Sequence, residues 1–113
     1  MEATRPKKMI WLVDDEPDLL RTYSEYLGTE FQTKTFLNAE AAIEAFELGS
    51  SPPDLLISDV KMPGLDGVQM AEQLKARNKE IPFLLLSGNA DRRDLAKAIS
   101  LGAADFIEKP CSI

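Results

Sequence analysis

Short apolar runs alternate along the chain with longer stretches in which apolar residues recur at helical spacing. The run at residues 9–13 has no polar interruption, which is typical of a strand buried on both faces. Residues 31–36 instead alternate apolar and polar positions and are rich in Thr, a pattern that favours an edge strand. Three further runs predict strands at 55–57, 83–86 and 104–107.

Helix signals fill the intervals between these strands. Pro17 opens the first helix and Gly28 ends it. Gln69 lies three residues after Asp66, the spacing of a capping box. The three later helices are predicted to begin at residues whose side chains can cap a helix, namely Asn38, Asp66 and Asp91.

Strands that alternate with helices of about ten residues imply right-handed crossovers and a mostly parallel sheet. The chain is therefore predicted to be an α/β domain with (βα)₄β organisation and a flavodoxin-like, doubly wound open sheet. Its 113 residues suffice for one small domain with a single core, and an apolar share of 44% is normal for a globular protein.

The charge of the chain argues against several classes of partner. A net charge of −6 is unfavourable for binding nucleic acid or an anionic membrane surface, because both need clustered Lys and Arg. No apolar run approaches the roughly 18 residues of a membrane span, and no long apolar stretch follows the basic N-terminus as in a signal peptide. The one cysteine, Cys111, suits a reducing compartment, so we expect a cytoplasmic protein.

Candidate chemistry gathers where the predicted strands end. The chain has no histidine, so any chemistry must rest on carboxylates, hydroxyls, Lys, Arg or the one thiol. In an open parallel sheet ligands bind at the carboxyl ends of the strands. The edge strand is followed only by Leu37 and Asn38. The other four strand ends deliver polar or small residues to this edge, and these are Asp14, Asp15, Ser58, Asp59, Ser87, Gly88, Glu108, Lys109 and Pro110.

Each of these residues also has a purely structural explanation. Either Asp14 or Asp15 could cap the first helix. Asp59 and Ser87 could be turn residues, and Lys109 could be a solvated surface lysine. One cap needs only one side chain, however, and the coincidence of all these groups at one edge favours a site.

Three ionised carboxylates repel one another when they lie close together. A divalent cation removes the conflict, and Mg²⁺ prefers hard oxygen ligands of this kind. A carboxylate can also act as a nucleophile and form an acyl phosphate. Lys109 and the hydroxyl of Ser87 could then contact the oxygens of the transferred phosphoryl group.

Four motifs in this order carry a resemblance to a known family. They are VDDEP at 13–17, SDVKMPGLDG at 58–67, LLLSGNA at 84–90 and GAADFIEKP at 102–110. Together they resemble the response-regulator receiver domain of bacterial two-component signalling, a CheY-like domain, over nearly the whole chain. A lone pair of Asp residues is a weak signal, but four ordered motifs form a strong one.

The resemblance implies a role for each site residue. Asp59 is expected to be the phospho-acceptor, and Asp14 and Asp15 to hold Mg²⁺, or Mn²⁺ as an alternative. Asp59 itself and the backbone carbonyl of Lys61 would complete the protein ligands. Lys109 is expected to pair with the phosphoryl group.

Further positions follow from the same resemblance. Ser87 would hydrogen-bond the phosphoryl group and move toward it on activation, and Phe106 would turn inward at the aromatic switch position. Gly88 leaves room for the phosphodonor, Asn89 and Lys61 tune dephosphorylation, and the bond before Pro110 is usually cis in the family.

The implied function is a phosphorylation-controlled signalling switch. A sensor histidine kinase or a phosphotransfer protein would donate the phosphoryl group to Asp59, and the change in conformation would control a covalently linked or separate output domain. The domain would not be an enzyme in the usual sense, since it would catalyse only its own phosphotransfer and dephosphorylation.

The expected domain covers residues 9–113, after an N-terminal extension at 1–8. Receiver domains have the strand order 2-1-3-4-5 and continue past the motif at 102–110 into a fifth helix, which is missing from this sequence. We therefore expect a piece trimmed before the last helix. Self-association through the uncovered face is a further hypothesis, and light scattering that showed only monomer at high concentration would contradict it.

Two other functions compete with this interpretation. An Mg²⁺-dependent aspartyl phosphatase would place its acids as Asp-x-Asp after the first strand, whereas Asp14 and Asp15 are adjacent. A receiver-like module that has lost phosphorylation usually lacks an acid or the lysine, and here both are present.

Overall fold

The computed structural model describes residues 7–49, 51–77, 81–88, 92–103 and 105–108. Five strands and four helices alternate along this part of the chain. The strands are β1 (Met9–Val13), β2 (Gln32–Phe36), β3 (Leu55–Asp59), β4 (Phe83–Ser87) and β5 (Asp105–Glu108). The helices are α1 (Pro17–Leu27), α2 (Ala39–Glu47), α3 (Gly67–Ala76) and α4 (Arg92–Ser100).

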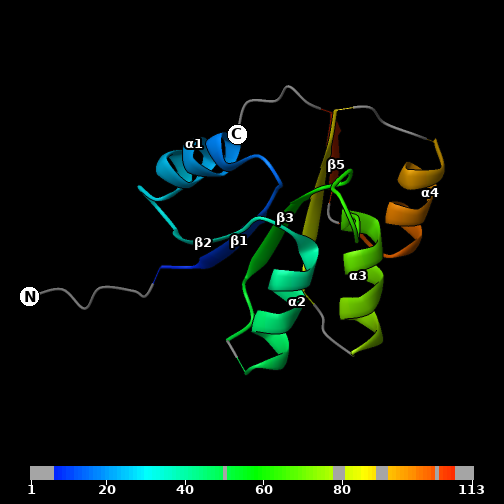
Figure 1. Cartoon of the computed structure of the whole chain (residues 1–113), viewed down its shortest axis with the longest axis horizontal. Helices are drawn as coiled ribbons and strands as arrows, with labels where there is room; N and C mark the ends of the chain where they lie inside the picture. Colours follow the sequence, from blue (N-terminus) through cyan, green and yellow to red (C-terminus); the bar gives the residue numbers. More distant parts are fainter. Residues whose placement is uncertain (1–6, 50, 78–80, 89–91, 104, 109–113) are drawn as a thin grey trace, which may run out of the picture.

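The strands form one parallel sheet in the order β2-β1-β3-β4-β5 (Figure 1). The α/β class, the five strands and the predicted strand order are thereby confirmed. The order reverses between β1 and β3, where two crossovers leave in opposite directions. Ligands of open α/β sheets bind at such a switch point.

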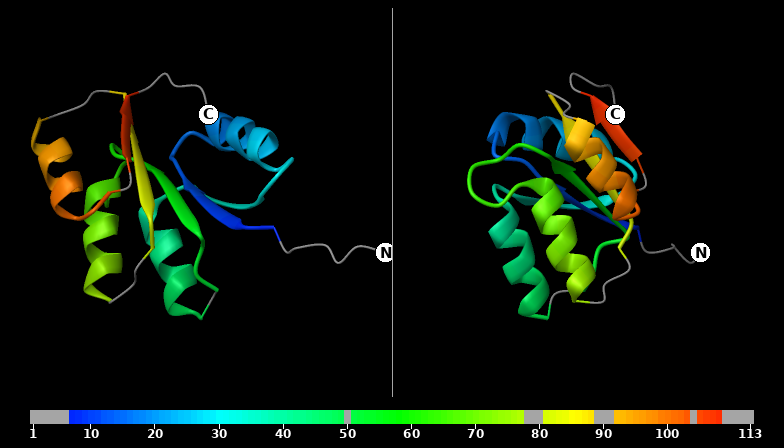
Figure 2. Two further views of the ribbon diagram at one scale, coloured as in Figure 1. Left: turned by 180° about the vertical axis from the view of Figure 1, so that it is seen from behind. Right: turned by 90° about the vertical axis from the view of Figure 1, so that its right-hand side faces the viewer.

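The helices divide between the two faces of the sheet. The helices α2, α3 and α4 lie side by side on one face, whereas α1 lies on the other (Figure 2). We call these the three-helix face and the α1 face. Along β1 the side chains alternate between them, since Trp11 packs toward the three-helix face and its neighbour Leu12 toward the α1 face.

Each face has its own core. Among the described residues, the core of the three-helix face holds seventeen buried residues; the rings of Phe36 and Phe46 lie 4.9 and 5.6 Å from that of Trp11. In the same part of the chain, the core of the α1 face holds six buried residues: Ile10, Leu12, Leu20, Leu27, Ile57 and Leu86. Both cores run across β1, β3 and β4, so these three strands form the rigid centre of the domain.

Local signals for the helices behave mostly as the sequence predicts. Pro17 is the first residue of α1. Asn38 caps α2, since its Oδ1 accepts a hydrogen bond from the Ala41 N–H at 2.7 Å. Asp66 and Gln69 form both hydrogen bonds of a capping box at α3. Asp91 lies outside the described residues.

Two predicted strands are longer in the structure than in the sequence pattern. Both β3 and β4 include the polar residues that were expected to follow them, Ser58 with Asp59 in β3 and Ser87 in β4. The ladder between the two strands continues to the pair Asp59 and Leu86. Backbone hydrogen bonds decide where a strand ends, and a change in side-chain polarity does not mark that point.

The edge strand β2 carries one feature of its own. The ammonium of Lys34 lies 5.6 Å from the ring centroids of both Trp11 and Phe36, within the range of a cation–π contact. Lys34 is exposed at the surface, although the rings below it are buried. The lysine stem thus covers the aromatic centre of the three-helix face at its open edge.

Within the described ranges, none of the helices has the length and apolar character needed to cross a membrane. The N-terminal extension lies mostly outside the described residues. Residues 109–113, which follow β5, also lie outside the described residues.

Candidate functional site

The carboxyl ends of β1 and β3 bring three acids together. Val13 pairs with Ser58 in the parallel ladder, so Asp14 and Asp59 follow side by side at the same edge of the sheet. One carboxylate oxygen from each of Asp14, Asp15 and Asp59 lies within 4.8 Å of the others. The sequence prediction of an acidic cluster is borne out in its geometry.

The three acids differ in their surroundings. Asp14 and Asp59 are 2% and 8% exposed, whereas Asp15 is open to solvent. Burying ionised carboxylates next to one another is costly unless a positive partner compensates them. Three hard oxygen donors that converge from two buried sites and one open site fit a divalent cation such as Mg²⁺.

The backbone around Asp14 is held from both sides. Its N–H donates to the carbonyl of Phe36 at 3.1 Å, which ties the end of β1 to β2. Its Oδ1 accepts from the Glu16 N–H at 2.9 Å. The N-cap position of α1 is Glu16, which makes no side-chain capping bond, so neither Asp14 nor Asp15 occupies the N-cap position.

Asp59 is fixed by contacts to its backbone. Its carbonyl oxygen accepts the Ser58 hydroxyl at 2.8 Å. A Cβ built on Gly67, the first residue of α3, would lie only 2.3 Å from the same oxygen. Only a glycine allows the helix to approach β3 so closely. Gly67 therefore sets the place of Asp59, a role that sequence reasoning missed although the residue ends the 58–67 motif.

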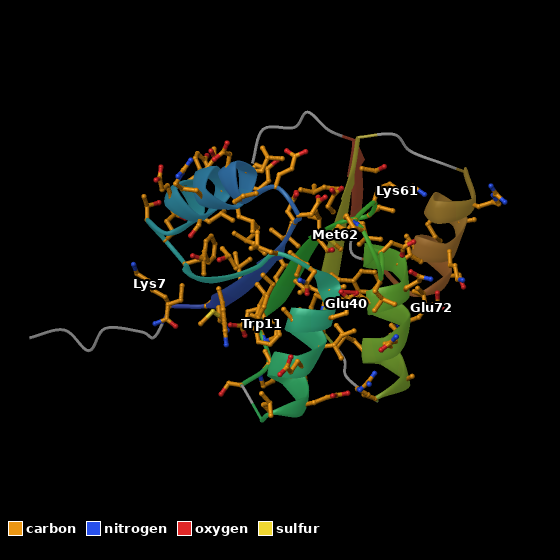
Figure 3. All side chains as sticks on the ribbon, viewed as in Figure 1. Lys7, Trp11, Glu40, Lys61, Met62 and Glu72 are labelled. Atoms are coloured by element: carbon orange, nitrogen blue, oxygen red, sulfur yellow. The ribbon has the colours of Figure 1, made fainter. Side chains whose placement is uncertain are left out.

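Ser87 and Lys61 lie at the carboxyl ends of β4 and β3, respectively. Ser87 is fully buried at the end of β4, one residue beyond Leu86, which pairs with Asp59. Lys61 is exposed in the loop that follows β3 (Figure 3). The hydroxyl and the loop backbone thus belong to the same sheet edge as the acidic cluster.

The remaining predicted residues are only partly described. The backbone of Phe106 in β5 pairs with Leu85 in β4, two positions before the ends of the two strands. Gly88 follows Ser87 and is exposed. Asn89, Lys109 and Pro110 lie outside the described residues.

A second contact that the sequence did not reveal joins α2 to the loop after β3. The Oε1 of Glu40 accepts a hydrogen bond from the Leu65 N–H at 2.9 Å. The two residues are 25 positions apart, so no local motif could have linked them.

Comparison with known proteins gives a consistent result. Residues 10–113 match the family model of the response regulator receiver domain. The chain is 33% identical over 106 residues to the DNA-binding transcriptional regulator NtrC of Escherichia coli strain K12, covering 93% of this chain and 22% of NtrC. It is 36% identical over 104 residues to the response regulator SaeR of Staphylococcus epidermidis, covering 89% of this chain and 43% of SaeR.

Solved structures agree with the sequence matches. Full-length FixJ from B. japonicum superposes with a TM-score of 0.83 at 33% identity, over 96% of this chain and 53% of FixJ. The BeF₃-activated receiver domain of DrrB gives a TM-score of 0.79 at 27% identity, over 94% of this chain and 87% of that one. The chain therefore spans less than half the length of the curated relatives and most of an isolated receiver domain.

Proposed function

The chain belongs to the family of response regulator receiver domains, and we propose that Asp59 is the residue at which it takes up a phosphoryl group. Members of this family are phosphorylation-dependent signalling switches, and phosphorylation of an Asp with Mg²⁺ dependence is general among them. The observation that carries the assignment is the convergence of three carboxylates within 4.8 Å at the switch point of the sheet.

Asp14, Asp15 and Asp59, with the backbone carbonyl of Lys61, would hold the cation. When bound, Mg²⁺, or Mn²⁺ in its place, offsets the negative charge of the phosphoryl group during transfer. Asp59 is suited to act as the nucleophile because its backbone is fixed by Ser58 and by the close approach of Gly67. A fixed nucleophile is favourable because little conformational freedom is lost on reaching the transition state.

The transfer itself needs one bond to form and one to break. A carboxylate oxygen of Asp59 attacks phosphorus in line with the phosphorus–nitrogen bond of a phosphohistidine. That bond breaks, the imidazole of the donor keeps the electron pair and takes up a proton, and Asp59 becomes an acyl phosphate. The donor must lie on another protein or domain, since this chain has no histidine.

Three further residues would bind or sense the phosphoryl group. The Ser87 hydroxyl, buried at the end of β4, is suited to donate a hydrogen bond to one phosphoryl oxygen. Lys109 would pair with another. Phe106 would follow the movement of Ser87 and carry the change in packing toward β5 and α4.

The partners follow from the same proposal. A sensor histidine kinase or a phosphotransfer protein supplies the phosphoryl group, in the cytoplasm. The relatives NtrC and SaeR are longer than this chain, and NtrC is a DNA-binding transcriptional regulator. We expect an output domain, linked or separate, to act downstream, and the net charge of −6 argues against nucleic-acid binding by the receiver domain itself.

The decisive experiment treats the protein with acetyl phosphate and Mg²⁺ and measures its intact mass. Wild type should gain one phosphoryl group, and Asp59→Asn should gain none, because the amide lacks the nucleophilic oxygen. Asp18→Asn is the matched control, since Asp18 lies exposed on α1 and pairs with Arg21. Addition that persists in Asp59→Asn would remove Asp59 from its role. Beryllofluoride, which mimics a bound phosphoryl group, is tested in parallel. If wild type neither gains a phosphoryl group nor binds beryllofluoride, the chain is a module that has lost phosphorylation.

A further inference from the structure

The loop at residues 60–66 connects β3 to α3 and is anchored at both ends. The Val60 N–H donates to the carbonyl of Leu86 at 2.8 Å, which extends the sheet one residue past β3. The Gly67 N–H donates to the carbonyl of Val60 at 2.9 Å, which closes the loop at its base. Met62 is 8% exposed and belongs to the core of the three-helix face. Lys61 therefore lies between two anchored neighbours.

The far side of the loop is held by Glu40. Its Oε1 accepts the hydrogen bond from the Leu65 N–H. Gly64, next to Leu65, has a φ of 76°, and a Cβ there would lie 3.3 Å from the same oxygen. A side chain at Gly64 would thus strain the backbone and crowd the carboxylate. Figure 3 shows Glu40 at the start of α2, beside the loop that carries Met62 and Lys61.

The carboxylate of Glu40 projects from a rigid element. Asn38 caps the helix, and α2 buries Ala39, Ala42, Ile43 and Phe46 in the core. An ionised acceptor makes a stronger hydrogen bond than a neutral one, typically by a factor of about two. Glu40 is therefore able to fix the position of a loop backbone that belongs to a different part of the chain.

We propose that Glu40 is a positioning residue for the phosphorylation site. By holding the Leu65 N–H, it keeps the loop in the conformation in which the carbonyl of Lys61 is presented to the acids. The inference rests on the proposed function, because it assumes that the Lys61 carbonyl and the three aspartates bind Mg²⁺. Glu40 acts through the loop and contacts neither the cation nor the phosphoryl group.

The test compares two substitutions of one residue. Glu40→Ala removes both the acceptor oxygen and the charge, whereas Glu40→Gln removes the charge and keeps an oxygen at Oε1. Both lose the favourable position of an anion in the first turn of α2, so a purely structural role would affect them alike. Glu44→Ala, one turn further along the same helix and also exposed, is the matched control.

Mg²⁺ affinity is measured by calorimetry, amide exchange of Leu65 by NMR, and stability by urea unfolding. Glu40→Ala should weaken Mg²⁺ binding roughly fivefold, the factor that corresponds to one lost hydrogen bond of about 1 kcal/mol. It should also accelerate exchange of the Leu65 amide. Glu40→Gln should restore both values to within about twofold, and Glu44→Ala should match wild type.

Two results would overturn the inference. Unchanged Mg²⁺ affinity in Glu40→Ala, with a faster Leu65 amide, would show that the hydrogen bond does not act on the site. Equal weakening in Glu40→Ala and Glu40→Gln would assign the effect to charge. Wild type that binds no Mg²⁺ would instead overturn the proposed function, and this outcome is distinguished because it is seen before any substitution is made.

Discussion

Leu84 and Leu85 are neighbours on β4 and point to opposite faces of the sheet. Leu85 is fully buried in the core of the three-helix face. Leu84 packs at the border of the core on the α1 face and stays half-buried, as does Leu55 on β3. The two faces thus carry leucines of the same strand, but these leucines are buried to different extents. In the described part of the chain, coverage depends on how many helices reach each face.

The comparison indicates which face of the sheet contributes more to the stability of the domain. Three helices pack over β1, β3 and β4 on one face; β1 and β3 position the three acids at their carboxyl ends, and β4 positions Ser87. The α1 face holds fewer buried residues, and β4 is not fully covered there. We therefore expect substitutions on the three-helix face to cost more stability and to disturb the site more.

The largest effect is expected for Leu85→Ala. It should lower the free energy of unfolding by about 3 to 4 kcal/mol, because it removes a fully buried side chain and leaves a cavity. Urea unfolding followed by circular dichroism measures the change. A loss below about 1 kcal/mol would mean that the side chains of the three-helix face can relax into the cavity. It would contradict the expectation that this face contributes more to stability than the α1 face.

Gly67→Ala should lower the free energy of unfolding by about 2 kcal/mol, because its Cβ would overlap the carbonyl oxygen of Asp59 unless α3 moves away. It should also weaken Mg²⁺ binding, measured by calorimetry. Gly49→Ala is the control, since it has a φ of 89° but a Cβ there meets nothing within 4 Å. That control should cost only backbone strain and leave Mg²⁺ affinity unchanged.

Leu84→Ala is the counterpart on the α1 face. It should cost about 1 kcal/mol, since the side chain is only partly buried and little new cavity forms. The same urea titration as for Leu85→Ala gives a direct ratio between neighbouring positions of one strand. Equal losses at the two leucines would show that the α1 face is as well packed as the other.

The smallest effect is expected at the ion pair between Lys97 of α4 and Glu72 of α3, where Nζ and Oε1 lie 3.0 Å apart. Both side chains are more than a third exposed, so solvent screens the pair. Glu72→Gln should change stability by less than about 0.5 kcal/mol, and by still less at high salt. A change above 1 kcal/mol would show that helix contacts at the surface, and not the core, distinguish this face.

Much of the fold could be predicted from the sequence because its signals are local. The apolar run at 9–13, Pro17, the Asn38 cap and the Asp66–Gln69 capping box each act over a few residues, and each is where the sequence indicated. The strand order also agreed with the prediction, since the resemblance supplied what periodicity alone does not.

Burial was harder to predict than secondary structure. The apolar run at 83–86 predicted a strand but not how far each side chain is covered, and Leu84 is half-buried while its neighbours are buried. A sequence pattern records which residues avoid water and carries no information on whether a helix reaches them. The ends of β3 and β4 were placed too early for a related reason, since backbone pairing continues through Ser58, Asp59 and Ser87.

The acids of the candidate site were predicted, but the contacts that Gly67 and Glu40 make around Asp59 and the loop after β3 were not. Strand ends in a parallel sheet meet at one edge, so Asp14, Asp15 and Asp59 could be grouped in advance. Gly67 and Glu40 act through distances in the folded chain, one by a close approach to Asp59 and the other by a hydrogen bond across 25 positions. Such contacts exist only once α2 and α3 are packed.

The lysine on β2 has a consequence for how the protein behaves among its neighbours. An edge strand leaves backbone groups unpaired, and they can recruit a strand from another molecule and start aggregation. Lys34 stands in the middle of this edge with its stem on Trp11 and Phe36 and its ammonium in solvent. A second sheet docking there would have to strip water from that charge. We therefore expect the residue that covers the aromatic core also to disfavour edge-to-edge association of the domain.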